Sequence, residues 1–407
     1  MITTMTPSSE NIRGTSALPY HLMLEREKNI EIEIYTFNNN ELSDEKIKKV
    51  ENELDVTIKK VPLPKWFFLV FKFRLLFVRL FLKYPIHHYI SLPKRYVDEI
   101  KAKRPDLIWV YGAEWSKVVN QFKGFQRIHS LPDSEALYYY RMLGQRFVTH
   151  DWKKFWRCVF MYPKFLALER NYAIDSSIHY HLVGEEDKAF LKKMNPKIQA
   201  HFIRHPHYEI KEKMGERREE RHSFQPKIKL LIAGQYNFYM KQEADLLNEV
   251  LRMNNEKLKG QYTITFLGKG WDTHVKNLKK AGYEVNHIKF APDYIEEICK
   301  YDIQITPIAI GTGTKGKVLD ALANGLLVIG TPYAMENIAV KHGESCIEYK
   351  HTQEVVDVLM DIPKNLKKYE KMACAGREAI LKHHGRSLIS QTLFSIFKKQ
   401  QFYKDVK

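Results

Sequence analysis

The sequence predicts an α/β protein with two Rossmann-like domains that face each other across a cleft. Short apolar segments alternate with longer amphipathic ones, which is the pattern of parallel α/β sheets. The 407 residues exceed the length that one ordinary core organises, so two domains are expected. Residues 209–226 are dense in charge and poor in apolar side chains, which is typical of a linker.

The expected elements follow the chain in order. In the first half, a helix follows Gly14 and strands are expected at 30–37, 106–112, 125–130 and 176–183. In the second half, strands are expected at 227–234, 262–268, 284–290, 302–308 and 326–332. We therefore predict a first domain over 1–208 and a second over 209–386, and a final helix, 387–407, that could pack back on the first domain.

Charge and cysteine content narrow the class of protein. The net charge of +17 suits polyanionic partners such as nucleic acid, anionic lipid or phosphate-bearing substrates. The four cysteines form no CxxC pair, which favours reduced thiols over disulfides or a zinc site. The start of the sequence does not resemble a secretory signal, so a cytoplasmic protein is expected.

A glycine-rich loop in the second half is the main functional signal. It comprises Gly311, Thr312, Gly313 and Thr314, and it directly precedes a predicted helix. Unpaired amides and the positive end of a helix dipole suit phosphates, and Lys315 or Lys317 could add charge. Asp320, one turn into the helix, could reach ribose hydroxyls. The alternative is a surface pair of Lys317 and Asp320 on an ordinary solvated helix.

The segment "DIQITPIAIGTGTKGKVLDALANGLLVIGTPYAMENI" resembles the donor-binding motif of retaining GT-B-fold glycosyltransferases of family 4, the group 1 type. The resemblance implies that the second domain binds a nucleoside diphosphate sugar, linked to UDP or GDP. Asp320 stands where the family holds the ribose. Thr312 replaces an earlier Glu of the family motif, as in a branch with a Gly-rich loop.

Two further segments of the second half match the same family. In "LLIAGQYNFYMKQEADLL", Lys241 stands at the phosphate-binding Lys, and Gln235 replaces an Arg. In "IKFAPDYIEEICKYDI", the loop from Ala291 through Pro292 to Asp293 corresponds to the one that frames the base. The alternative for Lys241 is a solvated lysine at a helix start.

The first half supplies the remaining candidates. "SSENIRGTSALPYHL" resembles the first glycine loop of the family, so Gly14 and Thr15 would approach the donor phosphates and the acceptor. His129 lies at a strand end where the family often carries a His that faces the transferred sugar, and a structural role is the alternative. Asp133 and Glu135 are weaker acid candidates.

The implied reaction is transfer of a sugar to an acceptor hydroxyl with retained configuration, with His129 and Lys241 as catalytic candidates. The acceptor would be a saccharide or lipid-linked saccharide, as in bacterial-type cell-surface polysaccharide or glycolipid synthesis. No cofactor is expected and, without an Asp-x-Asp motif, no metal. His201, His205 and His207 offer no persuasive metal set. The alternatives are a nucleotide-sugar epimerase of the same fold, or a non-enzymatic basic protein that binds nucleic acid or membrane.

Residues 62–85 form a basic aromatic segment. On one continuous helix, its cations would share a narrow sector that suits an anionic membrane surface: Lys65, Lys72, Arg79 and Lys83. A peripheral position at the inner face of the membrane is therefore one expectation. The alternative is a helix packed on the first domain. Residues 138–165 add a second aromatic, basic region that could flank an acceptor entrance.

Overall fold

The computed structural model describes residues 1–9, 14–73, 75, 77–144, 152–211 and 227–404. The chain divides into two compact units. The first unit comprises Met1–Arg146, Asp151–Pro206 and Arg386–Lys407, and the second contains His207–Gly385. The predicted linker lies outside the described residues from position 212 to 226.

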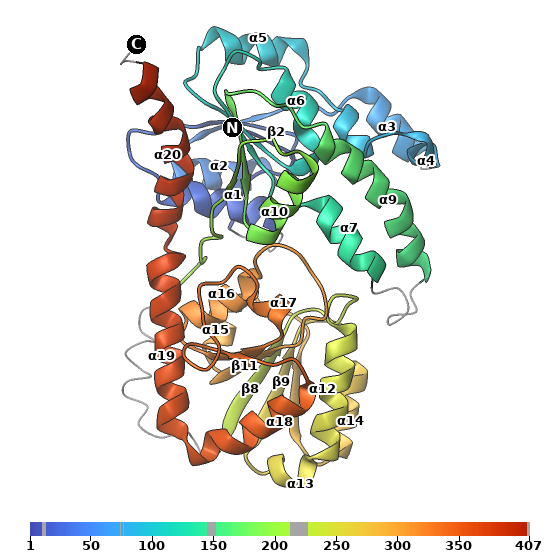
Figure 1. The fold of residues 1–407 in the computed structure, drawn as a ribbon, viewed down its shortest axis with the longest axis vertical. Coiled ribbons are helices and arrows are strands. Elements are labelled where there is room, and N and C mark those ends of the chain that lie inside the picture. The colour runs from blue at the N-terminus through green and yellow to red at the C-terminus, as the bar shows by residue number, and fades with distance from the viewer. Residues whose placement is uncertain (10–13, 74, 76, 145–151, 212–226, 405–407) are drawn as a thin grey trace. The chain divides into compact units, whose positions relative to one another are not determined.

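The first unit contains a parallel sheet of seven strands in the order β3-β2-β1-β4-β5-β6-β7 (Figure 1). Its strands are β1 (Ile2–Thr3), β2 (Glu33–Thr36), β3 (Thr57–Lys60), β4 (Ile108–Tyr111), β5 (Arg127–Ser130), β6 (Ile178–Leu182) and β7 (Ala200–Phe202). Its main helices are α1 (Gly14–Leu24), α2 (Asp44–Leu54), α5 (Lys94–Ala102), α6 (Ser116–Asn120), α7 (Glu135–Gly144), α9 (Trp152–Arg170), α10 (Glu185–Met194) and α20 (Arg386–Lys404).

The second unit contains a parallel sheet of six strands in the order β10-β9-β8-β11-β12-β13. The strands are β8 (Ile228–Ala233), β9 (Tyr262–Leu267), β10 (Glu284–Ile288), β11 (Ile303–Thr306), β12 (Leu327–Gly330) and β13 (Ile347–Glu348). The helices are α12 (Lys241–Met253), α13 (Asn255–Leu258), α14 (Asp272–Lys280), α15 (Tyr294–Ile298), α16 (Gly316–Ala323), α17 (Pro332–Met335), α18 (Thr352–Asp361) and α19 (Leu366–His383).

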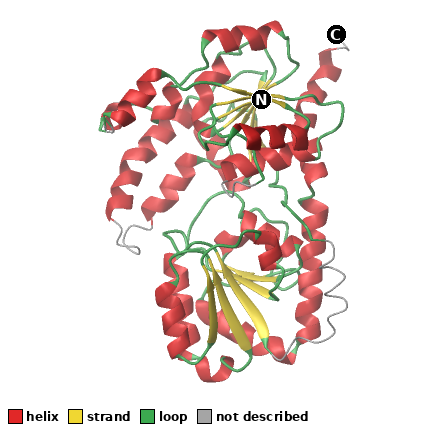
Figure 2. Ribbon diagram, turned by 180° about the vertical axis from the view of Figure 1, so that it is seen from behind, coloured by secondary structure: helices red, strands yellow, loops and turns green. Residues whose placement is uncertain are grey.

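Each face of the second sheet is covered by helices, as the view from behind shows (Figure 2). Leu230 and Ile232 of β8 join one apolar core, whereas their neighbour Leu231 joins another on the opposite face. Alternate residues of a strand point to opposite faces, so a strand covered on both sides is expected to be mostly apolar. The α/β class and the two Rossmann-like sheets are therefore confirmed.

The last helix packs within the first unit. Side chains of α20 join the core that contains α1, α2 and β4: Ile389, Leu393 and Phe394. The ring of Phe394 meets the Trp109 ring edge-on, with 5.7 Å between their centroids. Removal of α20 would therefore uncover apolar surface of α1 and β4.

The continuous helix predicted over 62–85 is wrong. The chain forms two short helices, α3 (Lys65–Lys72) and α4 (Val78–Phe81), so Arg79 does not follow Lys72 on one helix face and Lys83 lies beyond α4. Aromatic and β-branched residues are weak helix formers, and a short helix needs tertiary support. Lys164 of α9 donates to the carbonyls of Leu80 and Leu82, which fixes the end of α4.

Candidate functional site

The candidate site lies where the order of the second sheet reverses. The chain winds from β8 outward to β9 and β10, then returns to β11 on the other side of β8. In parallel α/β sheets, ligands bind outside the carboxyl ends of the strands at such a reversal. The loops after β8 and β11 therefore meet at the expected place, and Ala309 N donates to Tyr239 O at 2.7 Å between them.

The loop after β8 begins at a glycine that no other residue could replace without strain. Gly234 has a φ of +133°, and its carbonyl accepts from Trp271 Nε1 at 2.7 Å. Gly268, at the end of β9, has a φ of +136°, and a Cβ there would stand 2.3 Å from the Gly234 oxygen. The two glycines let the loop backbones pass in close contact.

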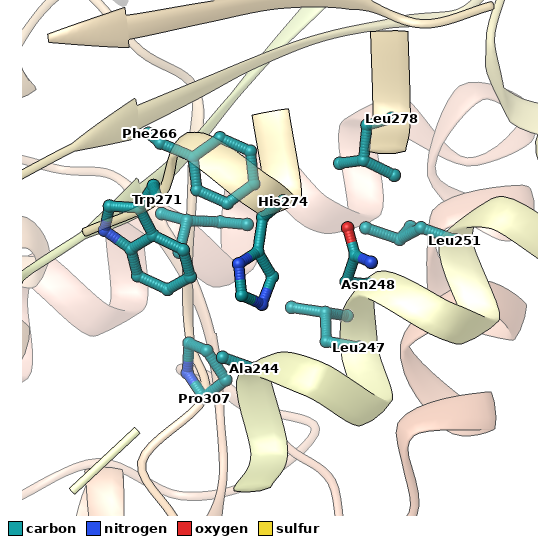
Figure 3. A pocket seen from close by; sticks show the side chains of 10 residues that line it. Ala244, Leu247, Asn248, Leu251, Phe266, Trp271, His274, Leu278 and Pro307 are labelled. Carbon is teal, nitrogen blue, oxygen red and sulfur yellow. The ribbon is translucent and has the colours of Figure 1, made fainter. Parts of the chain in front are cut away.

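Tyr236 holds the same loop in place. Its amide donates to Lys269 O at 2.9 Å and its hydroxyl donates to Asp245 Oδ1 at 2.8 Å. The same Asp245 oxygen lies 2.9 Å from His274 Nε2. Figure 3 shows His274 between Trp271 and the side chains of α12, in an apolar gap that leaves no space for a water molecule. This gap is part of the core and supports the loop from below.

The loop after β11 turns at Gly313, whose φ is +60°. The sequence could not decide whether Lys315 or Lys317 adds charge to a bound phosphate, but the structure places the two side chains differently. Lys315 Nζ donates to the carbonyls of Thr312 and Gly313 at 2.7 and 2.9 Å, so its ammonium stabilises the loop itself. Asn337 Nδ2 donates to the Gly313 carbonyl at 3.4 Å, a contact that the sequence did not suggest.

Lys317 lies differently. Its ammonium nitrogen is 3.1 Å from the position that a Cβ would take at Gly234, so it stands at the meeting point of both loops. The side chain is exposed, yet desolvation by the surrounding protein lowers its pKa, while the Asp320 charge raises it. The N-cap residue of α16, Lys315, makes no side-chain cap hydrogen bond. An anion at this point would meet an ammonium and the amino end of a helix.

Asp320 lies beneath that helix start and is only 5% exposed. Burial raises its pKa to about 7, and its Oδ1 accepts from Tyr208 N at 3.4 Å. Asn324, one turn on, accepts from Lys211 N and donates to Glu209 O, each at 3.0 Å. Asp320 and Asn324 thus anchor residues 208–211 along α16. The buried hydroxyl of Tyr294 has no hydrogen-bond partner among the described residues. Burial, and then the Asp320 charge, raise the pKa of Tyr294.

The other predicted donor residues lie on the loops of the same edge. Lys241 is the exposed first residue of α12, and Gln235 is exposed directly after Gly234. Pro292 is exposed and Ala291 half-buried in the loop after β10. That loop ends in Asp293, whose Oδ1 accepts from Glu296 N at 2.8 Å and caps α15.

In the first unit, Gly14 and Thr15 are the exposed first residues of α1. The Gly14 carbonyl accepts from the Tyr111 hydroxyl at 3.4 Å, and the Thr15 hydroxyl lies 2.9 Å from Met5 Sδ. The order of this sheet reverses between β1 and β4. The helix start that follows β1 therefore lies at the corresponding edge of the first unit.

His129 is 0% exposed, in the middle of the first sheet. Its Nε2 donates to Gly112 O at 2.7 Å, and the rings of Tyr172 and Tyr180 stand 5.5 Å away. Burial lowers the pKa of His129 to about 4, so the ring is neutral at pH 7. This environment favours the structural role that the sequence left open, and we assign His129 no contact with a sugar.

Two acidic side chains near the end of β5 have unusual environments. Burial raises the pKa of Glu135 to about 8 and that of Glu169 to about 7. Glu169 accepts from the Ser134 hydroxyl and the Ala136 amide at 2.8 and 3.0 Å, so it caps the start of α7. The sequence indicated Glu135 and Asp133 as acids, but it gave no signal for Glu169, which lies 35 residues from Ser134.

Within the described part of the chain, no group of three or more His, Cys, Asp or Glu side chains could hold a metal ion. His201, one of the histidines considered for a metal, instead pairs with His179 across 2.9 Å. A hollow of about 1000 Å³ opens at the amino edge of the first sheet, beside Glu33, Lys103 and Phe394, and it contains none of the predicted donor residues.

Residues 227–364 match the sequence model of the family described as glycosyl transferases group 1. The match covers 138 of the 407 residues, all of them in the second unit. The match spans both glycine loops, Lys241, Lys317 and Asp320. The resemblance that the sequence motifs indicated is therefore confirmed. No curated protein sequence matches the chain.

Solved structures extend the likeness in fold to both units of the chain. HepE of Anabaena, crystallised in complex with UDP, matches with a TM-score of 0.62 and 11% identity, over 98% of this chain and 99% of that one. WaaG, a glycosyltransferase involved in lipopolysaccharide biosynthesis, matches with a TM-score of 0.60 and 13% identity, over 97% and 99%. Sucrose-phosphate synthase of Thermosynechococcus elongatus matches at 0.65 and 11%, over 99% of each chain. The fold is GT-B.

Proposed function

We propose that this chain is a retaining glycosyltransferase that transfers a sugar from a nucleoside diphosphate sugar to an acceptor hydroxyl. The observation that carries the proposal is the position of the Lys317 ammonium against Gly234, beside the amino end of α16. Both loops of the sheet reversal converge there. HepE has been crystallised with UDP and with UDP-glucose, which supports a uridine or related diphosphate donor here.

In the proposed complex, the diphosphate lies on the amides of Gly313, Thr314 and the first turn of α16. Lys317 supplies a charge to it, Lys241 supplies a second from the start of α12, and Lys315 keeps the loop in shape. The ribose lies toward Asp320 and the Tyr294 hydroxyl, and the base toward Ala291 and Pro292.

The chemical demand is stabilisation of the departing diphosphate. The bond between the anomeric carbon and the diphosphate oxygen breaks, and the acceptor oxygen bonds to that carbon on the same face. The acceptor proton passes to an oxygen of the leaving diphosphate. Fixed amides and ammonium groups lower the energy of the charge that develops, without the need to reorganise water. No protein nucleophile is needed in this scheme.

The acceptor class follows from the neighbours only by analogy. WaaG acts in lipopolysaccharide biosynthesis, which supports a saccharide or lipid-linked saccharide acceptor in cell-surface polysaccharide or glycolipid synthesis. A nucleotide-sugar epimerase would release an isomerised sugar from the donor without an acceptor. Product analysis after incubation with the donor distinguishes the two reactions.

The test compares Lys317→Ala with the matched variant Lys315→Ala, because the two lysines lie two residues apart. UDP and GDP, with and without a chelator, should raise the melting temperature of the unaltered protein. Loss of a charge-assisted contact should weaken nucleotide binding roughly tenfold in Lys317→Ala. Lys315→Ala should change binding less.

The proposal fails if no nucleoside diphosphate or nucleotide sugar shifts the melting temperature. It also fails if Lys317→Ala binds nucleotide as tightly as the unaltered protein. Transfer from the donor that gives the largest shift then identifies the sugar, and the anomeric configuration of the product tests retention.

A further inference from the structure

The first unit exposes an unusual number of large apolar side chains on one side. We define the aromatic surface as Trp66, Phe68, Leu69, Phe73, Leu75, Phe77, Leu80, Phe81, Trp152, Trp156 and Phe160, all of which are exposed. Phe81 keeps 82% of its surface accessible. Soluble proteins rarely expose contiguous apolar areas of this kind unless something binds there.

Part of this surface is a stripe along α9. Trp152, Trp156 and Phe160 follow one another at four-residue spacing, which places them on one helix face. Trp152 and Trp156 are each 54% exposed. The opposite face of α9 is held in the core, where the rings of Phe165 and Tyr139 stack with centroids 5.4 Å apart. The stripe is therefore fixed outward by the packing of the other face.

The remaining part comes from α3 and α4, which lie beside α9. Lys164 of α9 is buried and donates to the carbonyls of Leu80, at 3.3 Å, and Leu82. Figures 1 and 2 both show α3 and α4 next to α9 on the same side of the first unit. Two segments about 80 residues apart in sequence thus form one surface.

The six tryptophans of the chain fall into an exposed group and a buried group. Three of the six are exposed, and all three belong to the aromatic surface: Trp66, Trp152 and Trp156. The other three are buried in the cores: Trp109, Trp115 and Trp271. Tryptophan favours the boundary between water and lipid, because its ring is apolar and its N–H is polar.

The charges around the surface all have one sign. Residues 62–85 and 152–168 contain nine Lys or Arg and no Asp or Glu. Exposed cations from both segments border the aromatic side chains: Lys65, Lys72, Lys83, Lys153 and Arg157. A rim of cations around aromatic side chains complements anionic headgroups above an acyl layer.

We propose that the aromatic surface docks the first unit onto an anionic lipid bilayer. The helices lie in the interface, with their apolar side chains among the upper acyl carbons and their cations at the headgroups. None of the described helices is long and apolar enough to span a membrane, and α3 has only eight residues. The contact is made by aromatic side chains of three helices rather than by one basic helix face. This inference goes beyond sugar transfer and does not depend on it.

The first test is flotation of the full chain with vesicles of phosphatidylcholine alone or with added phosphatidylglycerol. The protein should float with the anionic vesicles and about tenfold less with the neutral ones, because each cation near an anionic surface adds to binding. Absence of flotation with anionic vesicles would overturn the proposal. A dimer formed through this surface would be one cause of that result, and size-exclusion chromatography would detect it.

Variants separate the aromatic and charged contributions. The triple variant Trp152→Ser, Trp156→Ser, Phe160→Ser should lose flotation by at least about tenfold, because each side chain removes buried apolar area. Its control, Ile174→Ser with Leu388→Ser, changes exposed apolar residues of the same unit outside the surface and should float normally. Equal flotation of the triple variant and the unaltered protein would contradict the proposal.

Charge reversal is the second comparison. Lys72→Glu with Lys153→Glu should reduce flotation with anionic vesicles about tenfold and leave flotation with neutral vesicles unchanged. Lys48→Glu with Lys371→Glu reverses two exposed lysines elsewhere and controls for net charge. If both pairs reduce binding equally, the cations of the surface have no special role and the proposal is wrong.

Tryptophan fluorescence gives a direct measurement of contact. Vesicles with brominated acyl chains should quench the exposed tryptophans and leave the buried ones bright. The triple variant Trp66→Phe, Trp152→Phe, Trp156→Phe keeps the aromatic rings and should retain flotation, but it should remove most of the quenched emission. Quenching that persists in this variant would place the membrane contact elsewhere.

Discussion

The two sheets differ in what they bury. In the first sheet, all four residues of β5 are buried, and three of them are polar: Arg127, His129 and Ser130. In the second, the central strand β8 buries an almost entirely apolar run, Leu230–Ala233. In the second unit, Lys317 is exposed in the first turn of α16, and Lys229 of β8 is exposed as well. The second sheet also buries polar side chains, Thr265, Gln304 and Thr306, but these three carry no charge. The stability of the first sheet, which buries histidines, depends on the protonation of those histidines.

The largest expected effect of this difference is on stability in acid. Burial lowers the pKa of four histidines in the first unit, to about 3 for one and about 4 for the others: His181, and His129, His201 and His205. A buried neutral histidine stabilises the fold fully above its ordinary pKa of about 6.5. That contribution is lost as pH falls toward the folded pKa, because the unfolded chain binds the proton first.

Two carboxyl groups of the first unit have the opposite effect on how its stability changes with pH. The pKa of Glu135 is raised to about 8 and that of Glu169 to about 7, so the folded chain binds these protons first as pH falls. Four histidines less two carboxyls leave two protons taken up on unfolding. The free energy of unfolding of the first unit should then fall by about 3 kcal/mol per pH unit between roughly pH 6.5 and 4.5.

Hydrogen exchange followed by mass spectrometry would measure this prediction unit by unit. Peptides from β5 and β6 should lose protection in that range, while peptides from β8 and β9 should keep it. Equal loss in both units would show that the buried histidines do not account for the difference between the sheets.

The next largest expected effect is the loss of stability when a glycine of the second unit is replaced. Gly268→Ala would place a Cβ 2.3 Å from the Gly234 carbonyl at a φ of +136°. We expect a loss of about 3 kcal/mol in stability of the second unit, from backbone strain and the steric clash. Chemical denaturation would measure it. Gly260→Ala, where a Cβ meets nothing within 4 Å, is the matched control, and a similar loss there would disprove the stated cause.

The smallest effect tests whether Asp320 binds a ligand or only anchors the chain. Its raised pKa means that charging Asp320 costs stability as pH rises from about 4 toward 7. Asp320→Asn keeps an acceptor for Tyr208 N, so at pH 8 it should stabilise the second unit by about 1 kcal/mol. If Asp320 also holds the ribose, the same variant should weaken the melting-temperature shift caused by UDP or GDP. An unchanged shift would leave Asp320 only its structural role.

The sequence predicts the fold better than the details of the site. Apolar runs such as 227–234 and 326–332 have few alternatives to a buried strand, and the structure confirms them. The motif also directs attention to Gly311 and Lys317. Yet it could not separate Lys315 from Lys317, because their difference depends on which carbonyls each ammonium meets across the loop.

Two features of the first unit depend on contacts between segments that are far apart in the sequence. The helix predicted over 62–85 does not continue past α4, where Lys164, about 80 residues later, donates to the carbonyls of Leu80 and Leu82. His129 resembles a catalytic residue at a strand end, but Tyr172 and Tyr180 cover it from elsewhere in the chain. A local sequence pattern carries no information about contacts between residues so far apart in the chain. The surroundings of single side chains are therefore predicted less well than the positions of strands.

The position of α20 affects the order in which the protein can fold during synthesis. Most of the first unit is synthesised before the second, but it lacks Ile389, Leu393 and Phe394 until the second unit has been made. The unit made later, His207–Gly385, has all of its strands before then. The first unit therefore keeps part of its apolar core uncovered while the second unit is synthesised. If the ribosome stalled at that stage, the first unit, and not the second, would need a chaperone.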